Sequence, residues 1–347
     1  MRAVVLNGER DVSVEEVPDA VVPGPDGLLL RVERTAICGS DLHLYHGPMT
    51  IPGVHLGHEF VGTVEDVGRD VSTVTKGDRV IVSGVIGCGA CPNCRAGDAV
   101  TCRNAAMKVF GTSLELRGGQ AEAVGVPAAD ASVVKIPEGI TTEQAVLLTD
   151  ILPTGYLGAQ RAEITPGDVV VVIGLGPVGV FALQCAQLYG PSRILAVDMV
   201  PDRLARAEQL GAEPIDARDG NTVAKIYEAT GGRGADAVIE AVGADQTVSD
   251  AIMCAAAGGT ISVIGVNLNM AFPFPMALAL MKRLTFRVTL AAIPTTWPAL
   301  FPLVASGKLH PEDVFTHRLG LSHAAEAYRI FDAREDGVLK VLLDPSS

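Results

Sequence analysis

The run DVVVVIGLGPVGVFALQCAQ at residues 168–187 constrains the fold of this chain more than any other stretch. Four consecutive valines predict a strand that is buried on both faces, and the apolar residues after the glycines predict a helix. Between them, Gly174, Gly176 and Gly179 have the G-x-G-x-x-G spacing of a dinucleotide-binding turn. Gly174 would permit the tight turn, Gly176 would let the backbone approach a pyrophosphate at the helix N-terminus, and Gly179 would allow close contact between helix and strand.

The next predicted strand, RILAVD, adds a second signal because it ends in Asp198, 19 residues after Gly179. A carboxylate there would accept hydrogen bonds from the adenosine ribose and repel a 2′-phosphate, which favours NAD over NADP. The alternative is a Rossmann-like sheet that binds nothing, with Asp198 at a solvated strand end. The predicted phosphate turn also contains Pro177 and Val178.

The rest of the chain has two textures. From about Gly155, strands alternate with helices, which indicates a doubly wound parallel sheet; residues 250–259 lead into a strand at 260–266. Before and after it, short Val-rich runs are separated by Gly, Pro and Asp, a β-rich pattern. We therefore expect an α/β unit inserted between two parts of a β-rich domain. The early strands are expected at residues 2–6, 28–37, 60–67 and 78–86, with a helix at 323–331 and a last strand at 340–344.

Charge and hydropathy exclude several classes of function. The 347 residues carry a formal net charge of −13, which disfavours binding to nucleic acid or to anionic lipid. The apolar runs are much shorter than a membrane span, and the first residues have no apolar core of an export signal. We expect a cytoplasmic protein with a small-molecule substrate.

Four of the seven cysteines, Cys88, Cys91, Cys94 and Cys102, lie within fifteen residues. In a chain without an export signal, thiols clustered in this way indicate metal binding more than disulfides. Four thiolates form the closed tetrahedral site of a structural zinc ion. An iron–sulfur cluster and a nucleic-acid-binding zinc ribbon are the alternatives, and the negative charge disfavours the ribbon.

The segment GVHLGHEFVG at residues 53–62 places His55, His58 and Glu59 in a small, apolar run. Ionisable side chains in such surroundings need partners, since burying them alone is costly. Alone, His58 would be interpreted as a hydrogen-bonded structural histidine, and Cys38 as a core residue.

The combination of motifs changes this interpretation. The stretch GHEFVGTVEDVGRDVSTVTKGDRV at residues 57–80 matches, without a gap, the G-H-E-x2-G-x5-G-x2-V-x5-G-D-x-V pattern of one family. With CGSDLH at 38–43, the four-cysteine segment and GLGPVG, the chain resembles the zinc-dependent medium-chain alcohol dehydrogenases over essentially its whole length. These motifs are specific for the superfamily but not for a substrate.

This resemblance implies a fold of two domains. A GroES-like, β-rich catalytic domain would comprise residues 1–152 and 291–347, with a structural zinc lobe at about 86–104. A Rossmann domain that binds NAD would comprise residues 153–290.

The resemblance also implies a catalytic zinc ion held by Cys38, His58 and Asp150, where many relatives have cysteine in place of Asp150. Three ligands leave a fourth position for water or an alcohol, whose hydroxyl pKa zinc would lower. Glu59 would lie next to the ligands and serve at most as a transient ligand. Asp41 would orient His58 through its other ring nitrogen.

The same resemblance indicates which residues would remove the proton of the alcohol. Ser40 would hydrogen-bond the substrate oxygen, and His43 would carry the proton to solvent by way of the nicotinamide ribose. His46 is the replacement should His43 prove too distant. His55 has no role in the family, and we expect a surface or hydrogen-bonded histidine there.

Arg203 and Thr154 match cofactor positions of the family, and Val242, Gly265 and Val266 stand at strand ends that would meet the cofactor. For Lys340, which could reach the pyrophosphate, a solvated lysine is an equal alternative. The expected cofactor contacts are Arg203, Thr154, Val242, Gly265, Val266 and Lys340, and the expected apolar pocket residues are Phe110, Leu114 and residues 270–276.

The sequence therefore predicts a zinc-dependent, NAD-linked alcohol dehydrogenase with two zinc ions per chain that oxidises primary or secondary alcohols reversibly. A polyol or amino-alcohol dehydrogenase of the same superfamily is the alternative, although the apolar pocket residues disfavour a polyol. The quinone-reductase branch usually lacks zinc, and a zinc-stabilised NAD-binding regulator would bind the cofactor without consuming it. Relatives lead us to expect a homotetramer, with a dimer as the alternative.

Overall fold

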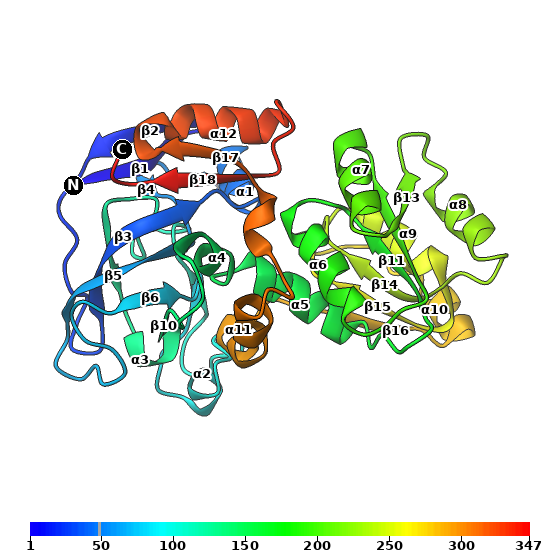
Figure 1. The fold of residues 1–347 in the computed structure, drawn as a ribbon, viewed down its shortest axis with the longest axis horizontal. Helices are drawn as coiled ribbons and strands as arrows, with labels where there is room; N and C mark the ends of the chain where they lie inside the picture. The colour runs from blue at the N-terminus through cyan, green and yellow to red at the C-terminus, as the bar shows by residue number, and fades with distance from the viewer. Residues whose placement is uncertain (48–49) are drawn as a thin grey trace. The chain divides into compact units, whose positions relative to one another are not determined.

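The structure is a computed structural model that describes residues 1–47 and 50–347 (Figure 1). It divides into two compact units. Unit 1 comprises Met1–Pro153 and Ala292–Ser347, and unit 2 comprises Thr154–Ala291. The sequence placed these boundaries after residues 152 and 290. Within the described residues, no helix is long and apolar enough to cross a membrane.

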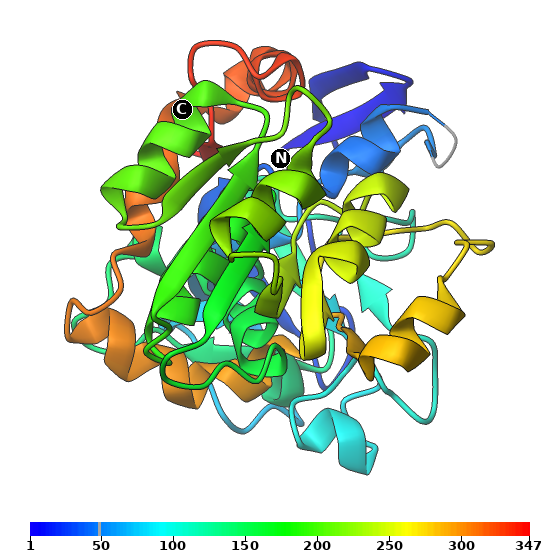
Figure 2. The same cartoon turned by 90° about the vertical axis from the view of Figure 1, so that its right-hand side faces the viewer.

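Unit 2 is a parallel sheet of six strands in the order β13-β12-β11-β14-β15-β16 (Figures 1 and 2). In chain order this is 3-2-1-4-5-6, the Rossmann arrangement, in which the direction of winding reverses next to the first strand. The strands are β11 (Val169–Ile173), β12 (Arg193–Asp198), β13 (Glu213–Asp216), β14 (Ala235–Glu240), β15 (Ala255–Val263) and β16 (Thr285–Val288).

The helices of unit 2 connect these strands, and the first of them follows the glycine turn, as the sequence predicted. They are α6 (Pro177–Gln187), α7 (Pro201–Gln209), α8 (Thr222–Ala229), α9 (Asp245–Cys254) and α10 (Met276–Lys282), while α5 (Ile151–Arg161) crosses the unit boundary. One boundary differs from the sequence pattern: β15 begins at Ala255 rather than at Thr260. Ala255 pairs with Ala235, and a register shift follows before Thr260 pairs with Ala237. Sheet pairing therefore extends the strand into a stretch that resembled the end of a helix.

Unit 1 is built on a seven-stranded sheet in the order β10-β6-β5-β3-β18-β17, with β9 also paired to β3 (Figure 1). A three-stranded sheet, β2-β1-β4, and the β7-β8 pair complete it. The strands are β1 (Arg2–Gly8), β2 (Asp11–Glu16), β3 (Leu28–Ala36), β4 (Val54–His55), β5 (Glu59–Val67), β6 (Arg79–Val82), β7 (Val85–Ile86), β8 (Lys108–Val109), β9 (Ala123–Val126), β10 (Val133–Lys135), β17 (Phe315–Gly320) and β18 (Lys340–Asp344).

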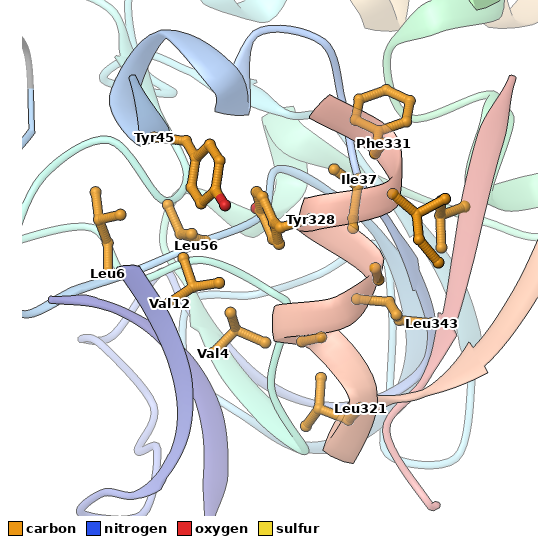
Figure 3. Close-up of a cluster of buried hydrophobic side chains, with 14 of the residues drawn as sticks. Val4, Leu6, Val12, Ile37, Tyr45, Leu56, Leu321, Tyr328, Phe331 and Leu343 are labelled. Atoms are coloured by element: carbon orange, nitrogen blue, oxygen red, sulfur yellow. The ribbon is translucent and has the colours of Figure 1, made fainter. Parts of the chain in front are cut away.

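The helices of unit 1 are short, apart from the last two. They are α1 (Asp41–Tyr45), α2 (Pro92–Arg95), α3 (Ala129–Ser132), α4 (Thr142–Leu147), α11 (Trp297–Ala305) and α12 (Ala324–Ala333). A hydrophobic core lies beneath α12, where Tyr328 and Phe331 pack among side chains from the first 60 residues, including Leu6, Tyr45 and Leu56 (Figure 3). Burial of this apolar surface joins the two ends of the chain into one unit.

Candidate functional site

Four ionisable side chains of unit 1 form the cluster that we call the open cluster: Cys38, His58, Glu59 and Asp150. Cys38 follows β3, His58 and Glu59 stand where β5 begins, and Asp150 lies between α4 and α5. One potential ligand atom from each lies within 4.8 Å of those of the others. Because β3 and β5 pair antiparallel, with Ala36 opposite Glu59, the sheet brings the first two segments together.

The distances in the open cluster fit a tetrahedral zinc ion. With bonds of the usual length, zinc would separate a sulfur and an oxygen ligand by about 3.6 Å, and a nitrogen and an oxygen ligand by about 3.4 Å. Cys38 Sγ lies 3.6 Å from Asp150 Oδ2, and His58 Nε2 lies 3.3 Å from the same oxygen. Thiolate, imidazole and carboxylate are all common zinc ligands. Cys38, His58 and Asp150 can therefore hold a zinc ion.

Asp41 contacts two of these expected ligands, Cys38 and His58. Its Oδ2 accepts a hydrogen bond of 3.0 Å from the backbone N–H of Cys38. Its Oδ1 lies 3.1 Å from Nδ1 of His58, within ion-pair distance but without hydrogen-bond geometry. A carboxylate beside Nδ1 favours a proton on that nitrogen, which leaves Nε2 free for a metal. Sequence reasoning missed Gln120, whose Nε2 donates to Asp41 Oδ2 at 3.3 Å, and no motif marks it.

Lys340 corrects one sequence prediction. It was expected to reach a pyrophosphate or to be solvated, but it is completely buried and its Nζ lies 2.7 Å from Oε1 of Glu59. Lys340 begins β18, whose pairing with β3 and β17 carries it into the core. The two buried charges neutralise each other. The second oxygen of Glu59, Oε2, has no hydrogen-bond partner within the described part of the chain.

Ser40 borders the open cluster. Its hydroxyl lies 3.3 Å from Cys38 Sγ and 3.2 Å from His58 Nε2, so it contacts two of the three expected ligands. His43 is on the exposed face of α1, and burial of part of the ring, together with the charge of His46, lowers the pKa of His43. His46 Nε2 instead lies 2.5 Å from Oδ1 of Asp332.

His55 does not behave as expected. It is buried in β4, and its Nδ1 has no hydrogen-bond partner among the residues that the structure describes. The surface alternative is therefore wrong, and within the described residues Nδ1 lacks the hydrogen bond of the other alternative. The pairing of β4 with β1, which places His55 opposite Val5, accounts for its burial.

The charges around the open cluster favour a cation. Burial raises the pKa of the Cys38 thiol. Burial alone would lower the pKa of His58, but its acidic neighbours, Asp41 first, raise it well above its usual value. Anionic neighbours thus attract a positive charge to this point, and a proton or a metal ion can supply it.

The second cluster, the four-cysteine cluster, lies in the segment around α2. Cys88, Cys91, Cys94 and Cys102 have their sulfur atoms within 4.8 Å of one another, and none forms a disulfide. Cys88 Sγ and Cys94 Sγ are 4.0 Å apart, close to the roughly 3.8 Å that tetrahedral zinc–thiolate bonds require. Hydrogen bonds from backbone N–H groups lower the pKa of Cys91 to about 6, which favours its thiolate, whereas burial raises the pKa of Cys94 to about 12. The cluster fits a closed zinc site.

The glycine turn of unit 2 has the geometry that its spacing predicted. Gly174 has φ +89°, which favours glycine, and a Cβ there would lie 2.4 Å from a methyl group of Val242. A Cβ on Gly179 would lie 1.7 Å from the carbonyl oxygen of Gly174. At Gly176, the N-cap of α6, a Cβ would meet only Arg203 among the described residues, at 3.9 Å. The turn therefore has free space at the one glycine where a phosphate would approach.

Asp198 is already hydrogen-bonded to the backbone. Its Oδ2 accepts from the N–H of Leu175 at 2.7 Å, and its Oδ1 accepts from Met199 and Val200 at 2.7 and 2.9 Å. Nη1 of Arg203 lies 3.7 Å from Oδ2. A carboxylate has about four lone-pair sites, so capacity for ribose hydroxyls remains. Asp198 also fixes the glycine turn, a role that its position in the sequence did not reveal.

The other residues predicted to contact the cofactor lie in unit 2. Pro177 and Val178 form the first turn of α6, Thr154 lies in α5, and Val242 and Val266 are exposed after β14 and β15. Gly265 lies so close to Gly243 that a Cβ would be 2.1 Å from the Gly243 nitrogen.

The apolar residues predicted to line a substrate pocket are only partly available. Phe110 is fully buried in the core of unit 1, with its ring centroid 5.1 Å from that of Phe60, so its assignment to the pocket is wrong. Leu114 is exposed. In residues 270–276, Phe272 and Phe274 pack against the hydrophobic core of unit 2.

Comparison with known proteins identifies the class. Residues 24–138 match the family model for the alcohol dehydrogenase GroES-like domain, and residues 177–306 match that for the zinc-binding dehydrogenase. A probable zinc-binding alcohol dehydrogenase of Mycobacterium tuberculosis is 49% identical over 349 residues, covering 100% of this chain and 89% of that protein. The chain belongs to the family of zinc-type medium-chain alcohol dehydrogenases. This confirms the predicted combination of a GroES-like and a Rossmann domain.

Solved structures agree. The alcohol dehydrogenase TADH from Thermus sp. ATN1 is 43% identical with a TM-score of 0.93, and the match covers 99% of each chain. A putative zinc-binding dehydrogenase from Sinorhizobium meliloti, solved bound to NADP, is 30% identical with a TM-score of 0.86, also over 99% of each chain. The protein is therefore an oxidoreductase of the alcohol dehydrogenase family.

Proposed function

We propose that this protein is a zinc-dependent, NAD-linked alcohol dehydrogenase that oxidises primary or secondary alcohols reversibly to aldehydes or ketones. The open cluster carries this proposal. Cys38, His58 and Asp150 present three donors at tetrahedral spacing, with the Ser40 hydroxyl 3.2 Å from His58 Nε2. Three protein ligands leave a fourth position at zinc, and Ser40 stands where it can hydrogen-bond a substrate oxygen.

Two zinc ions per chain belong to this proposal, one in each cluster. Zinc in the open cluster would lower the pKa of an alcohol hydroxyl, and NAD⁺ would accept the hydride from the alcohol carbon. Cys38, His58 and Asp150 would hold the ion, and Glu59, tied to Lys340 at 2.7 Å, would be at most a transient ligand. The four-cysteine cluster would stabilise the segment around α2 and leave no position for a substrate.

The chain's own residues would move the proton. Ser40 would accept it from the substrate hydroxyl, and His43 would deliver it to solvent from the exposed face of α1. The lowered pKa of His43 keeps its imidazole neutral near pH 7, so that the ring can accept a proton. His46 is less suited to this step because it is paired with Asp332.

Asp198 supports NAD as the cofactor, although a relative binds NADP. Its carboxylate lies at the end of β12, where it is hydrogen-bonded to the glycine turn. It would repel the negative charge of a 2′-phosphate bound beside it. Asp198→Gly should shift the kcat/KM ratio toward NADP by about 30- to 1000-fold, equivalent to about 2–4 kcal/mol. Asp198 also binds three backbone N–H groups. Asp198→Asn, which keeps the side-chain size but removes the charge and one acceptor oxygen, should shift the ratio in the same direction and separates the loss of charge from the loss of the side chain. A wild-type enzyme that prefers NADP would refute the assignment.

A substrate scan that follows NADH formation tests the activity. Primary, secondary and aromatic alcohols should be oxidised with a higher kcat/KM than polyols or amino alcohols. A preference for sorbitol-like or threonine-like substrates would instead support the polyol or amino-alcohol alternative. NAD binding without turnover of any alcohol or aldehyde would indicate a regulator and contradict the proposal.

We also propose that the chain forms a homo-oligomer, a homotetramer or alternatively a dimer, in the cytoplasm. Supporting self-association, β16 is the outer strand of its sheet, and Leu280 and Met281 on α10 and Val288 on β16 are exposed apolar side chains. Such residues at a sheet edge favour contact with another chain. Sedimentation equilibrium should give a multiple of 36.0 kDa, and Leu280→Glu with Met281→Glu should lower it. A monomeric wild type would disprove this.

A further inference from the structure

A chain of buried hydrogen bonds leads from the open cluster to the C-terminal helix α12. The hydroxyl of Tyr328 donates to Oε1 of Gln120 at 2.9 Å. Nε2 of Gln120 donates to Oδ2 of Asp41 at 3.3 Å and to the carbonyl oxygen of Ala36 at 3.1 Å. Asp41 then contacts both the Cys38 backbone and the His58 ring. Tyr328 is 208 residues from Gln120 in the sequence, so only the tertiary fold forms this chain.

The chain is shielded from water. Gln120 and Tyr328 are completely buried, and Asp41 is 2% exposed. In such surroundings a hydrogen bond has no competing water, and an unmade one costs the full desolvation of the polar group. The side chain of Gln120 makes three of its four possible hydrogen bonds: its two N–H groups have two acceptors, and its oxygen accepts from the Tyr328 hydroxyl.

The Asp41 carboxylate and the Ala36 carbonyl, which can only accept, fix which way the Gln120 amide faces. An amide turned by 180° would place its oxygen against the Asp41 carboxylate, which is repulsive, and its N–H₂ group against the tyrosine. The N–H groups therefore point at Asp41 and Ala36, and the Tyr328 hydroxyl holds the amide in place by donating to Oε1. The main chain of Gln120 is also fixed, by hydrogen bonds of 3.0 Å to Leu56 and 2.8 Å from Val4.

Gln120 also packs directly against the turn that carries the ligand His58. Gly57, the residue before it, has φ +99°, and a Cβ there would lie 2.4 Å from Cγ of Gln120. The glutamine thus contacts two supports of the open cluster, Asp41 and the backbone of Gly57.

We propose that Gln120 and Tyr328 are positioning residues for the metal site: they hold Asp41 in the one orientation that directs both Cys38 and His58 toward the ion. The proposal rests on the proposed function only in that a divalent ion binds the open cluster. Their contribution is to the pre-organisation of the ligands, so it should appear in metal affinity and ligand geometry rather than only in thermal stability.

The experiment is a Co²⁺ titration of protein whose open cluster has been emptied, with neither substrate nor cofactor present. Absorption bands of Co²⁺ report thiolate and imidazole ligation by Cys38 and His58. Tyr328→Phe should weaken Co²⁺ binding by about 2- to 10-fold, the effect of one lost hydrogen bond. Gln120→Met, which keeps the side-chain length, should weaken it by about 10- to 100-fold and alter the bands. The double variant should be no weaker than Gln120→Met alone, because both act through one chain.

Tyr45→Phe is the matched control. Its ring lies 5.4 Å from that of Tyr328 in the same hydrophobic core, but its hydroxyl takes no part in the chain (Figure 3). It should titrate like the wild type. The zinc content of the four-cysteine cluster provides an internal reference in each sample.

Wild-type affinity and spectra in both Tyr328→Phe and Gln120→Met would overturn the proposal, even if both variants were less stable. Should Gln120→Met fail to fold, the comparison of Tyr328→Phe with Tyr45→Phe decides. A protein that binds Co²⁺ as described but oxidises no alcohol would refute the proposed function and leave this inference standing.

Discussion

The open cluster and the four-cysteine cluster lie in the same unit but are assembled in opposite ways. The four cysteines come from one stretch of fifteen residues, and their sulfurs accept hydrogen bonds from neighbouring N–H groups, as in Cys91 N to Cys88 Sγ at 3.3 Å. The open cluster draws Cys38, His58 and Asp150 from three separate segments. Its support comes from farther still, because Lys340 and Tyr328 belong to the last 25 residues.

This difference teaches where each site obtains its geometry. A local loop can position four identical soft ligands, since zinc itself completes the tetrahedron. A site that must keep one position open needs its ligands held by the protein, and here buried partners surround them. The four-cysteine cluster should therefore depend on its metal, and the open cluster on the fold.

Removal of metal should reveal the largest difference between the two clusters. A chelator should take the ion with three protein ligands before the ion with four thiolates, and activity should fall by at least about 10³-fold because the Lewis acid is lost. Metal analysis should then give one zinc per chain in place of two, with the circular dichroism spectrum unchanged. Loss of both ions in parallel, or fewer than two zinc ions in fully active protein, would contradict the distinction between the clusters.

Ser40→Ala tests whether only the open cluster has acid–base machinery beside it. Alcohol oxidation should fall by about 10²–10⁴-fold, because the hydroxyl next to Cys38 and His58 would no longer accept the substrate proton. Zinc content and NAD affinity should hardly change. His43→Ala should do less harm and recover partly with imidazole or at high pH, and Thr101→Ala, near the four-cysteine cluster, should have no effect. Near wild-type turnover in Ser40→Ala would point to another proton route.

Lys340→Met removes the buried positive charge that pairs with Glu59 of the open cluster. Metal-free protein should lose about 3–5 kcal/mol of stability in denaturant unfolding, because a buried carboxylate is left unpaired. Zinc-bound protein should lose less, since the ion offers Glu59 another positive charge. Lys108→Met is the control: its pair with Glu115, at 3.0 Å, is exposed and should contribute below about 1 kcal/mol. Equal losses for the two variants would show that burial of the Lys340 pair has no special effect.

Asn104→Ala should have the smallest effect and completes the comparison. Its Nδ2 donates to Cys88 Sγ at 3.3 Å, but the residue is exposed. Loss of this hydrogen bond should reduce stability by about 0.5–1.5 kcal/mol and slightly speed loss of zinc from the four-cysteine cluster. Turnover should stay at the wild-type level. A large loss of activity would mean that the two clusters are coupled.

Much of the fold could be predicted because its signals are local. The valine strand, the glycine turn and the alternation of strand and helix predicted the Rossmann unit, and the position of β15 was missed only where sheet pairing extends a strand to Ala255. The metal ligands were found by the family motif rather than by the residue types. The positions of Phe110 and Lys340 were predicted wrongly because residue type alone does not determine which distant residues bury a side chain.

The sequence by itself determined the parts whose geometry is set within a few residues. Gly174 and Gly179 specify a turn because a side chain would not tolerate the φ angle of the first or the close contact of the second, and four cysteines at short spacing specify a tetrahedral cluster. Only the tertiary structure decided the neighbours of the open cluster. Glu59 meets Lys340, and Asp41 meets Gln120 and Tyr328, because strand pairing and burial of the α12 core bring distant segments together. Hydrophobic burial drives that assembly whatever the distance in sequence, so no local sequence pattern could predict it.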